Sequence, residues 1–566
     1  MNEANRKDKY QINMPSKGQE ESRYYIDGLY VMKKADESCE EKRPSRICRY
    51  IDIKEVLRDS DTGTINLKIS FDYKGQFKTI EVPRSILTRN KILALIEYGI
   101  DIVDDQARLK NLLQYLFYQE SIAPMTNSHS SIGLGEVDGK LIYKLSSAIG
   151  YDSKYSGQLD LEPHGTLEGW YDTIRNHVMG WTPLEVALTI GLAAPVASIL
   201  NSAKALEVQF VHLYGDSSMG KTIASSLAVS PYGSPNPKKK GLVQTWNATD
   251  NAVTSALRGV HGVPIAFDEA SIKGSNDFTS MIYTVAGGKE KMRLDREGRM
   301  RPQSTWSGIF ISNAEHSLMS NSKKNTGLAI RLTELGNVNW TRSAEHADAL
   351  KQGIMENYGQ AGFLMAQKIL EIGIEEICER HEEYRNILVK EIKTVDKFSD
   401  RIGDKVAIFL LAADIANQAL EISFDIEKIK DFFIENVCEK NEERDLGVKA
   451  YEYFRGAVTR LHKNFAHDTD VEFGYELWGK ISKVNGTIKE IAILQDPFHK
   501  LMKEGGFEET TVILTDWRTR GWLNCEKNKF TRKRVIRSCD GESRVYVINS
   551  IASSNQAKIK LYRQKG

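Results

Sequence analysis

Residues 208–222 read VQFVHLYGDSSMGKT, and this stretch decides the fold of the central part of the chain. Its first part, VQFVHLY, is an apolar run with the length of a buried strand. The second part matches the complete pattern GxxxxGK[ST], which forms a loop between a strand and a helix. The loop residues are Gly215, Asp216, Ser217, Ser218, Met219, Gly220, Lys221 and Thr222. The stretch therefore predicts strand, loop and helix in an α/β domain.

The chemistry of this loop favours a nucleoside triphosphate. Glycines let the loop close until its backbone N–H groups surround phosphates, and the N-terminus of the following helix adds a partial positive charge. We expect Lys221 to reach the β- and γ-phosphates and the Thr222 hydroxyl to bind Mg²⁺. ATP and Mg²⁺ are therefore the predicted cofactors. The alternative, a glycine-rich turn without a ligand, fits less well because the flanking strand and helix are the context that the motif requires.

A second strand pattern, VPIAFDE at 263–269, ends in two carboxylates. One acid at such a strand end can hold Mg²⁺, and the other can activate the attacking water. We assign Asp268 to the metal and Glu269 to the general base. Strands often end in acids, so this pattern gains its weight from the phosphate loop upstream.

The next strand pattern, Trp306–Ile311, ends at Ser312 and Asn313. An amide at this position can orient the water between Glu269 and the γ-phosphate, although asparagine also simply terminates strands. Farther on, Arg331 in GLAIRLTEL is a candidate for stabilising transition-state charge at the ATP of a neighbouring subunit, which would require an oligomer. A salt bridge or a surface position explains this arginine equally well.

A basic segment, GGKEKMRLDREGRMRP (287–302), lies between the acidic strand and the asparagine strand. Its six basic residues, against three acids, are Lys289, Lys291, Arg293, Arg296, Arg299 and Arg301. DREG at 295–298 is typical of a turn, so we expect a hairpin that projects from the ATPase core and moves with the nucleotide state. Lys289, Lys291, Arg293 and Arg296 would contact phosphates of a DNA strand without reading its sequence. The alternative is a solvated charged loop.

The patterns on both sides predict a multidomain α/β protein around this P-loop ATPase core with its parallel sheet. The expected parts are a disordered tail at 1–22, an α+β domain at 23–150, a helical connector at 151–206, the ATPase core at 207–336, a helical region at 337–470 and a winged-helix domain at 471–566. Within the α+β domain, 64–83 alternates apolar and polar residues around Lys-Gly, which is typical of a β-hairpin. The pair Asp59 and Asp61 indicates a polar turn rather than a metal-binding DxD.

The C-terminal stretch from Asp496 predicts two helices followed by a two-stranded wing, and strand patterns in this part of the chain are GWLNCE (521–526) and RVYVIN (544–549). A winged helix is a variant of the helix-turn-helix, a DNA-binding motif. Candidate phosphate contacts in it are Thr531, Arg532, Lys533, Arg534 and Arg537. Winged helices also dock proteins, so both interpretations stay open.

The composition of the 566 residues excludes some classes of protein. No stretch approaches the roughly 18 apolar residues that a membrane span needs, and the N-terminus lacks the apolar segment of a signal peptide. The six cysteines contain no CxxC pair. We therefore expect a cytoplasmic protein without membrane contact, zinc site or disulfide framework. The net charge of +1 says nothing about partners, because a basic channel can be balanced elsewhere.

Three segments together resemble a known family: GDSSMGKT, AFDEAS and YTVAGGKEKMRLDREGRMRPQSTWSGIFISNAE. This family, long labelled a domain of unknown function, includes the MCM-like, self-loading helicases of staphylococcal cassette chromosome elements and relatives in phages and islands. The resemblance is specific over about 207–335. It is looser over 64–83, over SHSSIGLGEVDGKLIYKL (128–145) and over the C-terminal domain.

The resemblance implies an AAA+ core in a hexameric ring that moves 3′ to 5′ along one DNA strand with the hairpin as its lever. The implied roles are nucleotide and Mg²⁺ contacts for Lys221 and Thr222, the second motif for Asp268 and Glu269, the sensor for Asn313 and the arginine finger for Arg331. In the family the sensor strand more often ends in a small residue, glycine and glutamate, whereas this chain has Asn313-Ala314-Glu315. Either Asn313 or Glu315 is therefore the sensor, and a second sensor arginine has no assigned position.

Motifs and resemblance together predict an ATP-dependent DNA helicase. We expect a ring-forming, MCM-like motor that moves on single-stranded DNA and unwinds forked duplex for the replication of a mobile genetic element. The first alternative is an ATP-switched replication initiator that binds origin DNA without unwinding it. An AAA+ protein remodeller fits less well because the hairpin lacks an aromatic residue, and a helicase–primase fusion lacks a convincing metal site.

Overall fold

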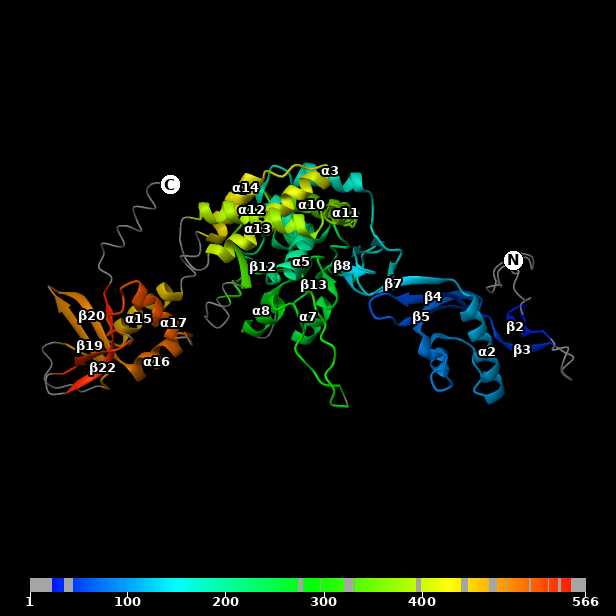
Figure 1. Cartoon of the computed structure of the whole chain (residues 1–566), viewed down its shortest axis with the longest axis horizontal. Coiled ribbons are helices and arrows are strands. Elements are labelled where there is room, and N and C mark those ends of the chain that lie inside the picture. The colour runs from blue at the N-terminus through cyan, green and yellow to red at the C-terminus, as the bar shows by residue number, and fades with distance from the viewer. Residues whose placement is uncertain are drawn as a thin grey trace. The chain divides into compact units, whose positions relative to one another are not determined.

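The structure is a computed structural model that describes residues 23–34, 44–272, 278–295, 297–319, 328, 331–392, 399–438, 446–467, 476–484, 486–507, 510–527, 529–537 and 541–550. Unit 1 contains the chain up to Pro163 together with Gly259–His261, and unit 2 contains His164–Arg258 and the chain from Gly262 onward. Both units combine helices with strands, which confirms the predicted multidomain α/β class (Figure 1). The tail predicted at 1–22 lies outside the described residues.

The central sheet of unit 2 has five strands in the order β13-β15-β16-β12-β17, and all neighbours are parallel. The strands are β12 (Gln209–Tyr214), β13 (Val243–Thr245), β15 (Ile265–Asp268), β16 (Ile309–Ala314) and β17 (Leu332–Gly336). Every residue of β16 and β17 is buried, as apolar strands covered on both faces should be. Because the strands are parallel, the chain segments that follow them all leave from one edge of the sheet.

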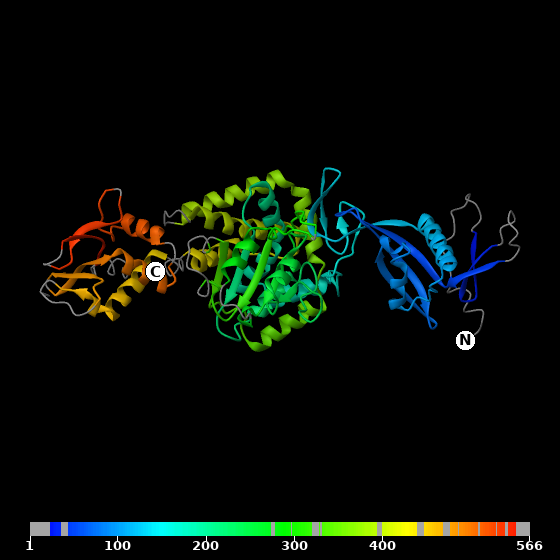
Figure 2. The same ribbon diagram turned by 90° about the horizontal axis from the view of Figure 1, so that it is seen from below.

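Helices cover this sheet, and further helices precede β12 and follow β17 in the chain (Figure 2). They are α3 (Leu167–His177), α4 (Thr182–Leu192), α5 (Ala194–Ala203), α6 (Lys221–Val229), α7 (Asp250–Leu257), α8 (Thr279–Ala286), α10 (Ala344–Glu356), α11 (Ala361–Ile372), α12 (Ile374–Glu391), α13 (Ser399–Ala419) and α14 (Ile426–Phe433). Helix α6, which follows the phosphate loop, packs on β15 and β16, and α4 packs on α6. The apolar segment of the predicted connector therefore forms buried helices around the phosphate-loop helix.

The C-terminal part of unit 2 has a core of its own, and its extent corrects the prediction. It contains α15 (Leu446–Arg460), α16 (Gln495–Glu504), α17 (Thr510–Thr519), β18 (Phe465–Ala466), β19 (Gly479–Val484), β20 (Thr487–Leu494), β21 (Arg532–Val535) and β22 (Glu542–Asn549). Phe454 of α15 packs against Phe498 and Trp517, with ring centroids 6.0 and 5.9 Å apart. Helix α15 thus belongs to this domain, and the predicted start at 471 was wrong.

The sheet of this C-terminal domain is also larger than the expected two-stranded wing. Its order is β18-β19-β20-β22-β21, so RVYVIN lies in a strand, as predicted, with β20 and β21 as its neighbours. Gly521, at a φ of 73°, ends α17, and the Trp522 N–H donates to the Trp517 carbonyl at 2.7 Å. GWLNCE therefore closes a helix and also pairs with RVYVIN through a short antiparallel bridge between Leu523 and Ile548, where the Asn524 N–H donates to the Val547 carbonyl at 2.8 Å.

Unit 1 contains three sheets, with orders β1-β2-β3, β11-β7-β4-β5-β6 and β10-β9-β8-β14. Its elements are β1 (Tyr24–Asp27), β2 (Tyr30–Lys33), β3 (Ser45–Arg49), β4 (Ile51–Asp59), β5 (Ile65–Tyr73), β6 (Gln76–Pro83), α2 (Gln106–Ile122), β7 (Met125–His129), β8 (Ile132–Val137), β9 (Lys140–Lys144), β10 (Ala148–Ile149), β11 (Lys154–Tyr155) and β14 (Val260–His261). The predicted hairpin at 64–83 is confirmed as β5 and β6. Its turn residues Lys74 and Gly75 have φ values of 53° and 84°, as a two-residue turn of the primed type requires.

The Asp59–Asp61 segment of unit 1 is a turn. Asp59 Oδ1 accepts the N–H groups of Asp61 and Thr62 at 2.8 and 2.9 Å, and Asp61 forms an ion pair with the buried Lys144. Both carboxylates thus have partners that stabilise the turn, in agreement with the predicted polar turn.

Among the described residues, no single helix is long and apolar enough to span a membrane. Helices α4 and α5, which meet at a 47° bend, reach that length and apolarity only when taken together.

Candidate functional site

The phosphate loop leaves the carboxyl end of β12 and enters α6 at Lys221. Gly220 has a φ of 82°, and a Cβ there would lie 2.7 Å from Thr341 Oγ1, so only glycine fits. Ser218 also takes a positive φ, 68°. The segment that follows β17 holds the loop, because the Trp340 N–H donates to the Met219 carbonyl at 2.9 Å. Its curved backbone is therefore fixed by tertiary contacts.

Lys221 reaches back across the loop that it ends. Its Nζ donates to the carbonyl oxygens of Gly215 and Asp216 at 2.9 and 2.7 Å. Burial lowers the pKa of the Lys221 ammonium, while the carboxylates of Glu315, Asp216 and Asp268 act in the opposite direction. The ammonium therefore stands, partly desolvated, inside the curve of the loop.

Thr222 and Asp268 meet as the sequence predicts. Thr222 Oγ1 donates to Asp268 Oδ1 at 3.0 Å, and the two residues come from the start of α6 and the end of β15. A hydroxyl and a carboxylate side by side form an all-oxygen donor set of the kind that Mg²⁺ prefers, with phosphate oxygens as further ligands. The residues present therefore fit a phosphate-bound Mg²⁺.

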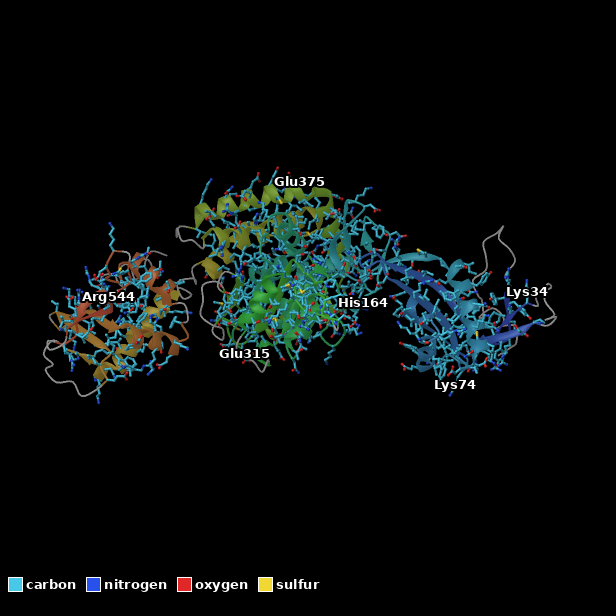
Figure 3. All side chains as sticks on the ribbon, turned by 60° about the horizontal axis from the view of Figure 1, so that its bottom comes forward. Lys34, Lys74, His164, Glu315, Glu375 and Arg544 are labelled. Atoms are coloured by element: carbon cyan, nitrogen blue, oxygen red, sulfur yellow. The ribbon has the colours of Figure 1, made fainter. Side chains whose placement is uncertain are left out.

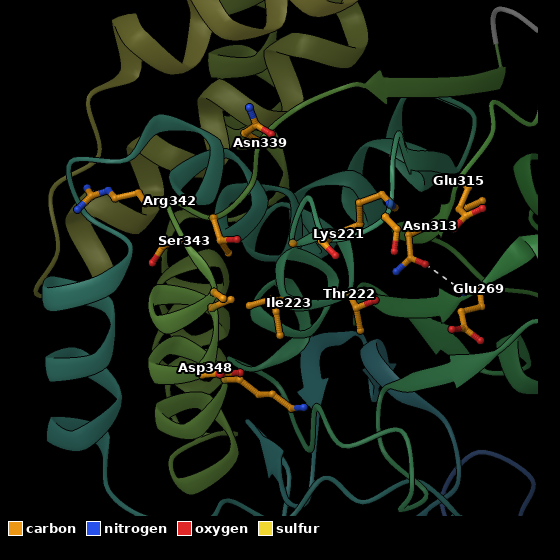
Figure 4. A pocket seen from close by; sticks show the side chains of 18 of the residues that line it. Lys221, Thr222, Ile223, Glu269, Asn313, Glu315, Asn339, Arg342, Ser343 and Asp348 are labelled. Atoms are coloured by element: carbon orange, nitrogen blue, oxygen red, sulfur yellow. Dashed lines mark hydrogen bonds between the residues drawn. The ribbon is translucent and has the colours of Figure 1, made fainter.

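Glu269 and Asn313 are joined by a hydrogen bond, drawn as a dashed line in Figure 4. The Glu269 N–H donates to Asn313 Oδ1 at 3.0 Å, and Asn313 Nδ2 donates to Ser225 Oγ at 3.2 Å. Glu269 has a φ of 62°, which is unusual for a residue with a side chain and is maintained here by the amide. Asn313 thus positions the backbone that carries the predicted base.

The strand that carries Asn313 is aligned by a buried polar chain. Trp246 Nε1 donates to Ser312 Oγ at 2.9 Å, and Ser312 Oγ lies 3.1 Å from His212 Nδ1. His212 Nε2 lies 3.0 Å from the His316 carbonyl oxygen. A carbonyl oxygen can only accept, so Nε2 carries a hydrogen. Burial lowers the pKa of His212 and favours the neutral ring, in which Nδ1 is the acceptor.

Lys221, Thr222, Glu269 and Asn313 line one side of a cavity of about 980 Å³ (Figure 4). Further lining residues, which no motif indicated, are Trp181, Asn339, Thr341, Arg342, Ser343, Asp348 and Lys351. Trp181 Nε1 donates to the Trp340 carbonyl at 2.8 Å, and the Arg342 guanidinium lies 5.3 Å from the centre of a Trp181 ring. Sequence reasoning missed these residues because their segments are far apart in the chain and carry no spacing pattern.

Glu315, the other candidate for the sensor, also lines the cavity (labelled in Figures 3 and 4). Its N–H donates to Ser271 Oγ at 3.2 Å. The structure thus brings both Asn313 and Glu315 to the site, with only Asn313 bonded to Glu269.

Arg331 does not line this cavity. It precedes β17, and its Nη2 lies 2.8 Å from Glu207 Oε1, just before β12. Its guanidinium stands 4.7 Å from the centre of the Tyr283 ring. Arg331 therefore lies near the amino ends of the strands, whereas the phosphate loop follows their carboxyl ends.

The basic segment forms a hairpin that projects past α7 and α8 (Figure 1). At its base Lys291 Nζ donates to Ser280 Oγ at 3.0 Å, and Arg293 donates to Asn251 Oδ1. Lys289 lines a shallow hollow beside Tyr283. Arg296 lies outside the described residues. Two of the four predicted DNA contacts are thus tied to α7 and α8 in this structure.

In the C-terminal domain, the basic residues of the predicted wing have acidic or polar neighbours. Arg534 lies 3.4 Å from Glu490, and Lys533 lies 3.4 Å from Glu542. Arg544, labelled in Figure 3, lies 3.3 Å from Glu526. Of these pairs, Lys533–Glu542 is exposed on both sides, so it is weak and would open to a phosphate at little cost.

Two family models match the chain. The model for "Domain of unknown function (DUF927)" matches residues 23–305, which is half of the chain, and the model for "Cch helix turn helix domain" matches residues 445–551. The second range includes α15, in agreement with its place in the C-terminal core. A search of curated proteins gave no match.

Among solved structures, the chain is similar to "SCCmec type IV Cch - active helicase", with a TM-score of 0.76 and 23% sequence identity, over 94% of this chain and 98% of that chain. At this identity the likeness concerns the fold. The family resemblance predicted from the phosphate loop, the acidic strand and the hairpin segment is confirmed. The chain belongs to the family defined by the domain of unknown function DUF927.

Proposed function

We propose that the chain is an ATP-dependent DNA helicase with an AAA+ core, which works as a ring and moves on single-stranded DNA to unwind duplex for the replication of a mobile element. The observation that carries the proposal is that the start of α6 and the ends of β15 and β16 are joined by two hydrogen bonds. The Thr222 hydroxyl donates to the Asp268 carboxylate, and the Glu269 backbone N–H donates to the Asn313 amide oxygen. This arrangement supports phosphate binding beside activation of water.

The hydrolytic roles follow from these positions. Bound Mg²⁺ would neutralise charge on the phosphates, with Thr222 and Asp268 as its protein contacts. Lys221 adds a fixed positive charge that is stronger for being partly desolvated. Glu269 accepts a proton from the attacking water, and Asn313 fixes the backbone from which that carboxylate extends.

Use of this energy on DNA is supported by three independent features. One is the basic hairpin, which joins α8 to β16 and so links the DNA-facing surface to the strand of Asn313. Another is the match of residues 445–551 to a helix-turn-helix model. The third is the shared fold with a protein described as an active helicase.

Assembly into a ring is supported by the place of Arg331. An arginine near the amino ends of the strands does not reach the phosphate loop of its own chain, whose cavity lies at their carboxyl ends. It is suited to the ATP of a neighbouring copy, where it would stabilise the charge of the transition state. In the free chain Glu207 keeps this charge paired.

The test is strand separation of a forked, end-labelled duplex of arbitrary sequence, with ATP and with a non-hydrolysable analogue. We expect separation with ATP only, and none with Glu269→Gln, which removes the proposed base. Glu379→Gln, which changes a carboxylate on α12, serves as the matched control. Hydrolysis without separation on any fork would reject the helicase and favour an ATP-switched initiator acting through the helix-turn-helix domain.

A further inference from the structure

The projecting hairpin sorts its side chains by chemistry onto two faces. Leu294 stands opposite Met300 in an antiparallel bridge, and Met292 lies two residues before Leu294. Because side chains alternate along a β-ladder, these three share one face. We name Met292, Leu294 and Met300 the apolar face.

Arginines occupy the opposite face of the same outer part of the hairpin. The Arg301 N–H donates to the Arg293 carbonyl at 2.9 Å, and the Asp295 N–H donates to the Arg299 carbonyl at 2.8 Å. These pairs flank the Leu294–Met300 bridge, so their side chains point the other way. We name Arg293, Arg299 and Arg301 the basic face.

The apolar face is strongly exposed. Met292, Leu294 and Met300 are 65%, 60% and 58% exposed, and among the described residues only Met125 is a large apolar side chain of similar exposure. A two-stranded ribbon with one uncovered apolar side is marginal in water. Three such side chains together on a projecting element indicate a surface that a ligand covers.

The charge of the hairpin decides which ligand this is. The segment 287–302 carries six basic residues against three acids, so a second copy of the hairpin would bring like charges together. A single strand of DNA instead offers phosphates to the basic face and apolar base surfaces to Met292 and its neighbours. Methionine and leucine are among the side chains that proteins wedge between base steps.

We propose that the apolar face contacts the bases of the DNA strand whose phosphates the basic face holds, so that the strand meets the hairpin with its bases on one face and its phosphates on the other. This inference rests on the proposed helicase function and adds a second, uncharged contact to it. The affinity should therefore depend on the presence of bases at high salt as well as at low salt, because salt screens phosphate contacts and not apolar ones.

The test compares the affinity of the full chain for single-stranded oligothymidylate and for an abasic oligonucleotide of equal length. We expect oligothymidylate to bind more tightly, by about tenfold for three apolar contacts. The triple variant Met292→Ser, Leu294→Ser, Met300→Ser should bring this ratio close to one and leave the salt dependence unchanged. These side chains are exposed, so thermal unfolding should stay as in the unmodified chain. Met125→Ser, at 63% exposure in unit 1, is the matched control.

Substitutions on the basic face should change the salt dependence of binding and leave its base dependence as it is. Arg299→Ala with Arg301→Ala should weaken binding to both oligonucleotides and reduce the slope of log affinity against log salt by roughly two. The ratio between the two oligonucleotides should stay as in the unmodified chain. A fall in the ratio without a change in slope for this variant would contradict the assignment of the faces.

A photoreactive Leu294→p-benzoylphenylalanine variant identifies the occupant directly. Crosslinks to DNA support the proposal, and crosslinks only to another copy of the chain overturn it in favour of a contact between subunits. An unmodified chain that binds both oligonucleotides equally overturns the inference while leaving the helicase proposal in place. A chain that neither binds DNA nor separates a fork overturns both.

Discussion

The cavity at the phosphate loop and the hairpin both carry basic side chains, and they hold them in different ways. In the cavity, Lys221 is partly desolvated and bonded to two carbonyls of its own loop. On the hairpin, the side chains of Arg299 and Arg301 are exposed to solvent. The Arg299 guanidinium lies 3.7 Å from the Asp295 carboxylate and 3.8 Å from the Glu297 carboxylate. The cavity is thus built before its ligand arrives, whereas the hairpin leaves its charges open to a partner.

This difference matches the work that each site would do. Catalysis depends on groups that need no reorganisation during the reaction, and the bonds through Asn313 and Asp268 supply that order. A motor must bind and release DNA of any sequence, so strong fixed contacts there would hinder movement. Substitutions in the cavity should therefore change rates strongly, and substitutions on the hairpin should change DNA affinity more gently.

The largest effect is expected for Lys221→Ala. Loss of the ammonium removes fixed charge from the phosphates, and ATP hydrolysis should fall by about 10³-fold or more. Phosphate release under saturating ATP measures it, with Lys390→Ala on the surface of α12 as the control. Substantial residual hydrolysis in the Lys221 variant would show that the phosphate-loop assignment is wrong.

The second effect separates the two sensor candidates. Asn313→Ala removes the acceptor of the Glu269 N–H and the donor to Ser225, so hydrolysis should fall by roughly 10- to 100-fold. Glu315→Gln retains the backbone bond to Ser271 and should have a smaller effect. The ratio of kcat values decides between them, and a larger loss for Glu315→Gln would make that residue the sensor.

A milder effect is expected at the base of the hairpin. Lys291→Ala with Arg293→Ala removes two cations, so affinity for single-stranded DNA should fall at every sequence, and the salt slope should decrease by roughly two. Titrations at several salt concentrations measure the slope. An unchanged salt slope would mean that Ser280 and Asn251 hold these side chains in the DNA complex as well. DNA would then contact the hairpin farther from its base.

The smallest effect concerns pH and the buried His212. Burial lowers the pKa of His212 below its usual value of 6.5. At pH values between the folded-state pKa and 6.5, the unfolded chain therefore binds a proton that the folded chain does not. The stabilising contribution is complete above about pH 6.5 and is lost as the pH falls toward the folded-state pKa. The unfolding midpoint should therefore drop on acidification, and less steeply in His212→Gln than in the exposed control His462→Gln. Equal slopes in both variants would place the titrating group elsewhere.

The sequence by itself determined the parts of the molecule whose physics is local. The strand and loop at 208–222, the strand that ends in Asp268 and Glu269, and the hairpin at 64–83 each follow from apolar runs, alternation or turn residues that neighbours in the chain supply. The family resemblance also followed from contiguous motifs. The roles of Asn313 and Arg331, and the DNA contacts, stay predictions.

Only the tertiary structure decided what depends on distant segments meeting. It placed Trp181, Arg342, Asp348 and Lys351 around the phosphate loop, although none of them belongs to a pattern. It moved α15 into the C-terminal core, where aromatic packing with Trp517 outweighs its position next to the helical region. It also used GWLNCE to close a helix, because a glycine at positive φ stops α17 there. Side-chain periodicity shows which face of a segment is apolar, whereas the partner of that face is set by packing across the whole chain.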